Sequence, residues 1–185
     1  MRQVKILDKE FKLFISATEI YRNINRMARE INHDLHDKEV VFIGVLNGSF
    51  MFASELYKHI DIMSKITFLK LASYHGTESS GTVKRLIGIN ESLENKVVVI
   101  LEDIVDTGNT LVDLMHQLQE YNPASIKVAT LLFKEEAYTK TIPIDYIGLR
   151  IPNAFIVGFG LDYNGYGRNL EDIYQVVSGN FDTSL

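Results

Sequence analysis

Apolar residues recur at helical intervals in three parts of the chain. Ser16 stands three residues before Glu19, which is the spacing of a capping box, and an amphipathic pattern follows it. Three or four positions separate the apolar residues of each segment, so three amphipathic helices are predicted. The pair Asn122-Pro123 predicts the end of the third helix. The apolar positions are Ile20, Ile24, Met27, Ala28 and Ile31, then Phe52, Ala53, Leu56 and Ile60, then Leu111, Leu114, Met115 and Leu118.

Apolar runs between these helices predict the strands. Residues 40–46 and 97–101 are continuously apolar, as expected for strands that are covered on both faces in a parallel sheet. Residues 66–74 are rich in β-forming side chains, and the polar residues 75–81 separate them from another apolar run that ends near Ile89. The polar stretch predicts a flexible loop. Further strands are predicted at residues 126–133, 145–149, 155–159 and 174–177.

The alternation of strands and helices predicts an α/β fold with a mainly parallel central sheet flanked by helices. In such folds ligands bind beyond the carboxyl ends of the strands, so the functional loops are expected to be those that follow strands. The sequence has no internal repeat, no low-complexity tract and no break in composition that would indicate a linker. We therefore expect one domain that spans residues 1–185.

The composition agrees with a single globular domain and excludes several classes of protein. Of the 185 residues, 46% are apolar and 23% are charged. The 19 basic and 24 acidic side chains give a net charge of −5, with no basic block of the kind that binds nucleic acid. Cysteine is absent, which excludes disulfides, thiolate zinc sites and a cysteine nucleophile. The first residues interleave charged with apolar side chains, so we expect no signal peptide, no membrane partner and a cytoplasmic location.

Three sequence patterns that commonly indicate a binding site are incomplete or absent in this chain. Residues 76–82 have the glycine spacing of a phosphate-binding P-loop but lack the lysine that must follow the second glycine. No GxGxxG motif follows a predicted strand, so the main sequence argument for a dinucleotide site is missing. His33 and His36 lie at a charged helix end without a third ligand nearby, which indicates solvated side chains rather than a metal site.

The segment 97–111 carries the most informative chemistry. Its buried strand delivers two adjacent carboxylates, Glu102 and Asp103, and a third carboxylate, Asp106, opens a short polar loop before the next helix. Three negative charges would repel a phosphate unless a ribose diol or Mg²⁺ lies between them. For any one of these residues alone, a solvated strand end or a helix cap is the simpler interpretation.

The loop that follows has the features of a phosphate cradle without a lysine. Gly108 allows the backbone to come close to a ligand. The backbone amides of residues 106–110 and the hydroxyls of Thr107 and Thr110 can converge on one anion at the N-terminus of the predicted helix. An anionic ligand is therefore expected at this end of the helix.

The whole string resembles the phosphoribosyl-diphosphate signature of type I phosphoribosyltransferases: four apolar residues, two acids, two apolar residues, then Asp-Thr-Gly-x-Thr. Other segments resemble the hypoxanthine-guanine branch of this family. They are residues 45–56 for its pyrophosphate loop, residues 71–81 for its flexible catalytic loop with Ser73 and Tyr74 at the base, and residues 131–134 and 155–170 for its purine and metal segments. The resemblance implies a single domain in which a small hood accompanies the parallel sheet.

The resemblance also implies a reaction. Ribose 5-phosphate moves from phosphoribosyl diphosphate to hypoxanthine or guanine, and pyrophosphate is released. Asp106 is implied to be the general base that accepts the N7 proton of the purine. Lys134 matches the lysine that donates to the 6-oxo group, and Phe155 matches the ring that stacks on the base. Backbone groups near Ile156 and Asp162 are implied to read the rest of the purine.

The phosphate and metal ligands follow from the same resemblance. Mg²⁺ is implied to be the cofactor, placed between the pyrophosphate, the ribose hydroxyls and Asp162. Glu102 and Asp103 are implied to complete this metal site by holding the hydroxyls and the waters of the ion. Pyrophosphate is implied to contact Arg168 and the loop of Leu46, Asn47 and Gly48, where the family can adopt a non-proline cis peptide. The residues implied to bind the phosphoribosyl group are Glu102, Asp103, Asp106, Thr107, Gly108, Asn109 and Thr110.

Two positions depart from the family pattern. Asn47 and Asn109 stand where relatives often carry a basic side chain, so Mg²⁺ and backbone amides must compensate for two missing cations. Two alternatives stay open, a regulatory protein of the same fold that senses phosphoribosyl diphosphate or nucleotides, and an enzyme that prefers xanthine. The family is commonly dimeric or tetrameric, which implies a homo-oligomer.

Overall fold

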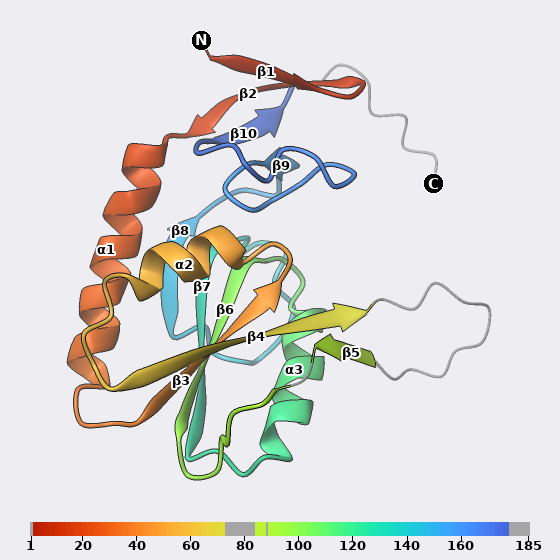
Figure 1. Cartoon of the computed structure of the whole chain (residues 1–185). Coiled ribbons are helices and arrows are strands. Elements are labelled where there is room, and N and C mark those ends of the chain that lie inside the picture. Colours follow the sequence, from red (N-terminus) through yellow and green to blue (C-terminus); the bar gives the residue numbers. More distant parts are fainter. Residues whose placement is uncertain (1, 73–83, 88, 178–185) are drawn as a thin grey trace.

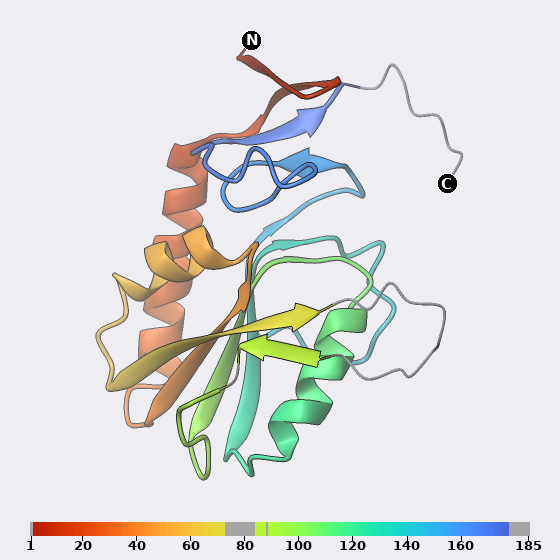
Figure 2. The same ribbon diagram turned by 45° about the vertical axis from the view of Figure 1, so that its right-hand side comes forward.

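The computed structural model describes residues 2–72, 84–87 and 89–177, which form two sheets. The larger sheet makes the body of the molecule, and the smaller one lies beyond one end of it as a hood (Figure 1). The same arrangement is seen after a 45° turn (Figure 2). Ser73 and Tyr74, predicted at the base of a flexible loop, lie outside the described residues.

Within the described residues, the larger sheet has six strands in the order β5-β4-β3-β6-β7-β8. β5 pairs antiparallel with β4 at one edge, and the other pairings are parallel. The mainly parallel sheet predicted from the sequence is therefore confirmed. The strands are β3 (Val40–Leu46), β4 (Ser64–Ala72), β5 (Lys84–Ile87), β6 (Val97–Val105), β7 (Ser125–Phe133) and β8 (Tyr146–Arg150).

Helices cover both faces of this sheet. α1 (Ala17–Asp34) and α2 (Phe50–Tyr57) lie on one face, and α3 (Asn109–Gln119) lies on the other (Figure 1). Successive residues of a strand point to opposite faces, so a continuous apolar run can serve both cores. The first face buries Phe42, Val99 and Leu131, and the second buries Ile43, Ile100 and Val128.

The three predicted helices are all present, but α2 ends at Tyr57, so Ile60, predicted as one of its apolar positions, lies beyond it. α1 starts as the capping-box spacing predicts, because the Oγ of Ser16 accepts a hydrogen bond from the amide of Glu19 at 3.3 Å. Its buried positions are those of the predicted apolar stripe. α3 ends at Gln119, shortly before the Asn122-Pro123 pair.

The hood is an antiparallel sheet built from both ends of the chain. Pairing runs in the order β1-β2-β10-β9. The side chains of Phe11, Val157, Tyr174 and Val176 form its core. The hood implied by the family resemblance is therefore present. Its strands are β1 (Gln3–Ile6), β2 (Lys9–Ile15), β9 (Ile156–Val157) and β10 (Ile173–Val176).

The hood also corrects two strand predictions. The strand predicted at residues 155–159 is limited to β9, because Gly158 and Phe159 have positive φ angles of 106° and 47° that a strand does not accommodate. β9 and β10 pair with each other and not with the parallel sheet. The β1–β2 hairpin was not predicted, although residues 9–15 alternate charged with apolar side chains over part of their length.

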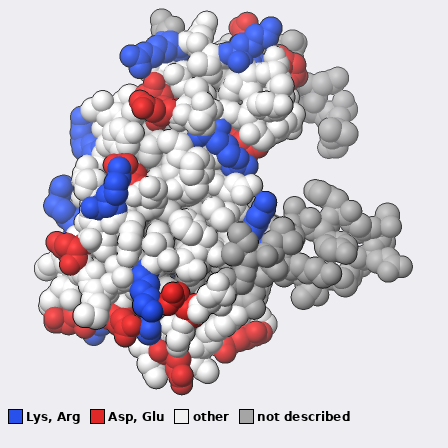
Figure 3. All heavy atoms as spheres, viewed as in Figure 1, with Lys and Arg blue, Asp and Glu red and all other residues white. Residues whose placement is uncertain are grey.

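Charged side chains of both signs lie on the face of the molecule shown in Figure 3. On the face shown in Figure 3, Lys and Arg are interspersed with Asp and Glu and do not gather into one basic patch. None of the helices in the described ranges combines the length and the apolar character that crossing a membrane requires.

Candidate active site

A cavity of about 310 Å³ opens at the carboxyl end of β6 and is lined by residues 102–111. β3 and β7 flank β6 in parallel, so their carboxyl ends reach the same edge of the sheet, on the side of the hood (Figure 1). This is the edge at which parallel α/β sheets bind ligands. The phosphoribosyl-diphosphate signature read from the sequence therefore forms the wall of one cavity.

β6 is longer than the sequence predicts. It continues beyond residue 101 to Val105, because it stays paired with β7 as far as Phe133. Glu102 and Asp103 therefore lie within the strand, and their side chains point to opposite faces of the sheet. Glu102 is only 6% exposed. The two acidic residues are thus paired within the central strand β6, near its carboxyl end, and do not form a solvated strand end.

Burial disfavours the charged form of both carboxylates. Burial, and then the negative charge of Asp103, raise the pKa of Glu102 well above its ordinary value. Burial also raises the pKa of Asp103 to about 6, although backbone hydrogen bonds and the charge of Arg168 oppose the shift. Within the described residues, no other side chain donates a hydrogen bond to either carboxylate. A cation bound beside the pair would favour the charged forms.

The loop between β3 and α2 packs directly against this acidic pair. A Cβ atom on Gly48 would lie 1.9 Å from Oδ2 of Asp103, so a side chain at this position would displace the carboxylate. The peptide bond between Leu46 and Asn47 is cis, as the family resemblance implies. Ser49 is completely buried, and its Oγ has no hydrogen-bond partner among the described residues. The predicted pyrophosphate loop and Asp103 are therefore in contact.

Asp162 and Arg168 meet in a turn of the hood. Arg168 Nη2 lies 2.6 Å from Oδ1 of Asp162, and Nη1 donates to the carbonyl of Gly160 at 2.6 Å. Oδ2 of Asp162 accepts a hydrogen bond from the amide of Gly165 at 2.6 Å. A Cβ atom on Gly160 would lie 2.1 Å from the carbonyl oxygen of Gly48. This turn therefore touches the β3–α2 loop and brings Arg168 near the acidic pair.

Glu102, Asp103 and Asp162 do not converge into one metal-binding cluster. Across the ranges that the structure describes, no group of three or more His, Cys, Asp or Glu side chains is arranged to hold an ion. Asp162 is instead engaged by Arg168, and both charges act on Asp103. The roles of Glu102, Asp103 and Asp162 toward Mg²⁺ therefore stay predictions, with Asp162 near Asp103 and ion-paired with Arg168.

The loop after β6 is shaped by a glycine. Gly108 is the N-cap of α3 and has a φ of 85°, a left-handed conformation that favours glycine. A Cβ atom there would also lie 2.5 Å from the ring of Tyr138. The amide and the hydroxyl of Thr139 donate to the carbonyl of Thr107 at 3.4 and 3.3 Å. The first amides of α3 can bind an anion here, beside the exposed side chains of Thr107, Asn109 and Thr110.

The register of β6 and β7 places Asp106 beside Lys134. Val105 pairs with Phe133, and the next residue of each strand supplies one partner of the contact. Lys134 Nζ donates to Oδ2 of Asp106 at 2.9 Å and to Oδ1 of Asn153 at 3.2 Å. Lys134 is 8% exposed, whereas the side chain of Asp106 is 45% exposed and lines the cavity. The ammonium is therefore buried, and the carboxylate is accessible to a ligand.

Phe155 presents a partly exposed ring at the edge of the hood. The residue is 41% exposed. Its ring centroid lies 5.8 Å from that of Tyr163, with an interplanar angle of 89°, and 6.3 Å from that of Phe11. Ile156 is 6% exposed and pairs with Gln175 in β10. The Phe155 ring is thus supported by two aromatic neighbours while part of its surface is open.

Comparison with known proteins agrees with this geometry. Residues 16–164 match the family model of the phosphoribosyl transferase domain. The chain belongs to this phosphoribosyltransferase family. A hypoxanthine-guanine phosphoribosyltransferase from Streptococcus pyogenes is 42% identical over 160 residues, which cover 86% of this chain and 89% of that protein. A protein of the same description from Lactococcus lactis is 40% identical over 168 residues, which cover 90% of this chain and 91% of the relative.

Solved phosphoribosyltransferase structures share the fold. A hypoxanthine-guanine phosphoribosyltransferase from Bacillus anthracis superposes with a TM-score of 0.83 at 36% identity, over 90% of this chain and 97% of the other. A hypoxanthine phosphoribosyltransferase from Staphylococcus aureus gives a TM-score of 0.84 at 37% identity, over 90% of this chain and 91% of the other. The predicted fold class is therefore confirmed.

Sequence reasoning missed some residues that shape the site of this phosphoribosyltransferase. Asn153 holds Lys134, Tyr163 supports Phe155, and Gly160 lets the hood approach the β3–α2 loop. The only sequence signal for Asn153 and Tyr163 is that each lies within two residues of a predicted site residue. Their contacts depend on how the hood sits on the sheet, which local patterns do not encode.

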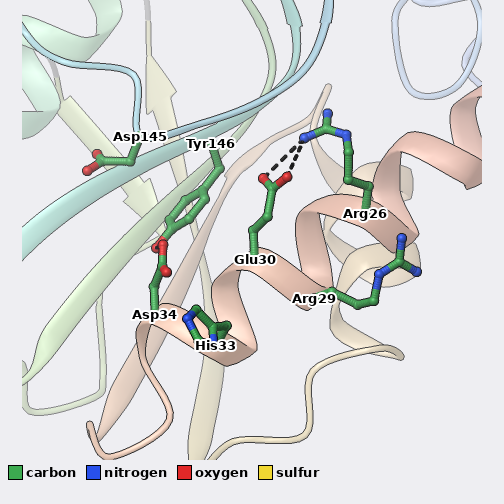
Figure 4. Close-up of a pocket in the computed structure, with 7 residues that line it drawn as sticks. All are labelled: Arg26, Arg29, Glu30, His33, Asp34, Asp145 and Tyr146. Atoms are coloured by element: carbon green, nitrogen blue, oxygen red, sulfur yellow. Dashed lines mark hydrogen bonds and ion pairs between the residues drawn. The ribbon is translucent and has the colours of Figure 1, made fainter.

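A second concavity of the phosphoribosyltransferase, of about 420 Å³, lies between α1 and β8 (Figure 4). Arg26 in this concavity donates to the carboxylate of Glu30 at 2.8 Å. The same guanidinium donates to the carbonyls of Ile147 and Gly148 at 2.7 and 2.9 Å. These bonds attach α1 to the edge strand β8 and engage both terminal nitrogens of Arg26. The lining consists of Arg26, Arg29, Glu30, His33, Asp34, Asp145 and Tyr146.

Proposed function

We propose that this phosphoribosyltransferase transfers the 5-phosphoribosyl group of phosphoribosyl diphosphate to hypoxanthine or guanine in purine salvage. The products are the nucleoside monophosphate and pyrophosphate. The observation that carries the proposal is the contact between Asp106 and Lys134, which sets a proton acceptor and a hydrogen-bond donor side by side at a phosphate cradle. The names of the relatives from Streptococcus pyogenes and Lactococcus lactis support the same activity.

Three side chains divide the work on the purine. Asp106 is the general base that removes the N7 proton as the ribose carbon leaves pyrophosphate. Lys134 donates to the 6-oxo group, which selects oxopurines over adenine because a 6-amino group does not accept in the same way. Phe155 stacks its open face on the base, and backbone groups near Ile156 and Asp162 read the remaining edge.

Backbone amides bind most of the phosphate charge. The N-terminus of α3 and the loop of residues 106–110 bind the 5′-phosphate, with no cation from Asn109. Leu46, Asn47 and Gly48 present the amides of their loop to pyrophosphate. Arg168 adds a planar guanidinium, which is suited to two oxygens of one phosphate. The buried hydroxyl of Ser49, which has no partner in the described structure, lies in the same loop.

The acidic pair fits Mg²⁺. Glu102 is buried and Asp103 is partly buried. Neither carboxylate accepts a hydrogen bond from another side chain among the described residues, and burial raises the pKa of both. Mg²⁺ commonly takes one or two protein carboxylates and completes its shell with water and substrate phosphate. Glu102 and Asp103 would therefore hold the ion or its waters, with Asp162 nearby. The chemistry that the bound ion supplies is neutralisation of the charge on the leaving pyrophosphate.

Further proposals concern the whole protein. We propose that residues 1–185 act as one domain, because the hood that carries Phe155 is built from both ends of the chain. We also propose a cytoplasmic homo-oligomer, dimeric or tetrameric, by analogy with the family.

A panel of bases tests the proposed function. The purified chain is incubated with phosphoribosyl diphosphate, Mg²⁺ and one base, and nucleotide is measured by chromatography. Turnover is expected with hypoxanthine, guanine or both, and not with adenine or uracil. A preference for xanthine would change the substrate but keep the reaction. No nucleotide from any purine would overturn the proposal and favour a protein that only binds phosphoribosyl diphosphate or nucleotides.

A further inference from the structure

In the structure, the ammonium of Lys134 already makes two of the three hydrogen bonds that it can donate. An ammonium has three hydrogens and no acceptor. One points to Oδ2 of Asp106 at 2.9 Å, and a second to Oδ1 of Asn153 at 3.2 Å. No third acceptor for Lys134 is found among the described residues. Because Lys134 is only 8% exposed, the remaining hydrogen is costly to leave unpaired.

The two acceptors come from independent parts of the fold. Asp106 follows β6 in the body of the molecule, whereas Asn153 lies in the link between β8 and β9, two residues before Phe155. Backbone hydrogen bonds fix both ends of this link. The amide of Ile151 donates to the carbonyl of Phe133 at 2.9 Å, and the carbonyl of Phe155 accepts from the amide of Val176 at 3.0 Å.

Two fixed acceptors leave one direction for the third hydrogen. A lysine side chain is flexible, and a single acceptor would allow its ammonium to rotate about one hydrogen bond. The second acceptor removes that freedom, since the tetrahedral ammonium then has only one hydrogen direction open. The amide of Asn153 must present its oxygen to Lys134, because an ammonium cannot accept from the amide nitrogen.

We infer that Asn153 is a positioning residue for recognition of the purine 6-oxo group. It holds the ammonium of Lys134 so that the third hydrogen points at the substrate oxygen, and its link places the stacking ring of Phe155 on the same base. This inference rests on the proposed function. Asn153 itself touches neither the transferred ribose nor the proton that Asp106 removes.

Loss of the Asn153 oxygen has a specific consequence. Asp106 becomes the only described acceptor, so the ammonium turns toward that carboxylate and away from the purine oxygen. Binding of a 6-oxopurine should weaken, whereas binding of phosphoribosyl diphosphate should not change. Unsubstituted purine carries hydrogen at position 6 and makes no hydrogen bond to Lys134 through a 6-oxo group. Its binding should therefore be almost insensitive to loss of the Asn153 oxygen.

The test compares Asn153→Ala, Asn153→Leu and Asn153→Asp with the parent, using hypoxanthine and unsubstituted purine. The alanine and leucine variants remove the acceptor, and leucine keeps much of the volume. We expect both to raise the KM for hypoxanthine by ~5–20-fold and to shrink the preference for hypoxanthine over purine by a similar factor. The KM for phosphoribosyl diphosphate should stay within ~2-fold of the parent value. Asn153→Asp keeps an acceptor and should stay within ~3-fold for hypoxanthine.

Controls separate the outcomes. Asn25→Ala removes an asparagine whose side chain bonds to the carbonyl of Tyr21 within α1, and it should behave as the parent. An inactive parent would refute the proposed function. If the parent is active and either folded acceptor-free variant keeps the parent's KM for hypoxanthine and its preference over purine, the inference is overturned and the proposed function is not. Equal losses for hypoxanthine and unsubstituted purine would also overturn it, because they indicate general damage to the site. If both acceptor-free variants fail to fold, a rise of more than ~20-fold in the hypoxanthine KM of Asn153→Asp overturns it, and a parent-like KM supports it.

Discussion

In the proposed reaction Asp106 interacts with two groups, the ammonium of Lys134 and the N7 proton of the purine. In the structure its carboxylate accepts a hydrogen bond from Lys134 at 2.9 Å, and the side chain remains 45% exposed. Acceptance of the purine proton neutralises the carboxylate and weakens this ion pair. The third hydrogen of Lys134 can then strengthen its bond to the 6-oxo group of the product base. The two residues therefore act on neighbouring positions of one edge of the purine, N7 and the 6-oxo group, and are coupled through their own contact.

Asp106→Asn separates these two functions. The amide keeps an oxygen that can accept from Lys134, but it cannot take a proton, so kcat should fall ~10²–10⁴-fold. The KM for hypoxanthine should change by less than ~3-fold, since the donor to the 6-oxo group stays in place. Steady-state kinetics with saturating phosphoribosyl diphosphate measure both constants.

Asp113→Asn is the matched control, because Asp113 is an exposed carboxylate on α3 outside the cavity lining. It should retain the parent kcat. A parent-like kcat in Asp106→Asn would show that Asp106 is not the base. A large rise in KM without a fall in kcat would instead make it a residue that only orients Lys134.

The hairpin β1–β2 supports the purine-binding ring from a distance in sequence. Its turn carries Asp8, whose Oδ1 accepts a hydrogen bond from the hydroxyl of Tyr163 at 2.9 Å. The Nζ of Lys9 lies 5.3 Å from the centroid of the same Tyr163 ring. Tyr163 in turn packs edge-on against Phe155. The N-terminal element therefore sets the position of a ring that the proposed function places on the base.

Tyr163→Phe tests this support at the level of the element. It keeps the ring against Phe155 but removes the bond to Asp8, so the hairpin then holds the ring without its one hydrogen bond from the hydroxyl. We expect the KM for hypoxanthine to rise ~2–5-fold with little change in the KM for phosphoribosyl diphosphate. Asp8→Asn keeps an oxygen acceptor and is the matched control, expected within ~2-fold of the parent. Equal changes in the two KM values would contradict a role confined to the purine side.

Single helices and strands were predictable from the sequence, whereas the pairing of strands within the hood was not. α1 was predicted because its apolar stripe and the Ser16 cap are encoded within consecutive residues. β10 pairs with β2 across almost the whole chain, and no local pattern specifies such a pairing. β9 is short because two positive φ angles follow it, and Phe159, unlike Gly158, gives no sequence warning of that conformation.

The same distinction holds within the site. Asp106, Lys134 and Phe155 were assigned from the sequence, because their segments match family motifs. That Asp106 touches Lys134 depends on the register of β6 against β7, which hydrophobic runs leave undetermined. Asn153 was missed for a related reason, since its bond to Lys134 depends on the path of the link between β8 and β9. The ion pair of Asp162 with Arg168 depends on a turn of the hood, which the sequence also leaves undetermined.

The whole molecule must attract a polyanion despite its own charge. Its net charge is −5, and acidic and basic side chains are mixed on the face shown in Figure 3. Attraction by the net charge of the protein therefore cannot draw phosphoribosyl diphosphate to the site. Local groups must do so, and the sequence supplies asparagine at positions 47 and 109 in place of two cations. Within the proposed function, that leaves Arg168, Lys134, the backbone amides and a metal ion.

This balance predicts an obligatory requirement for a divalent ion. Excess chelator should lower the rate of nucleotide formation at least ~100-fold, because the acidic pair would then face the diphosphate without a cation between them. Added Mg²⁺ should restore the rate. Glu102→Gln and Asp103→Asn should each raise the Mg²⁺ concentration needed for half-maximal rate, whereas Asp113→Asn should leave it unchanged. Circular dichroism in chelator should still show the folded protein, which separates loss of the ion from loss of structure. Full activity in excess chelator would contradict the metal requirement and would mean that Arg168 and the amides suffice to neutralise the leaving group.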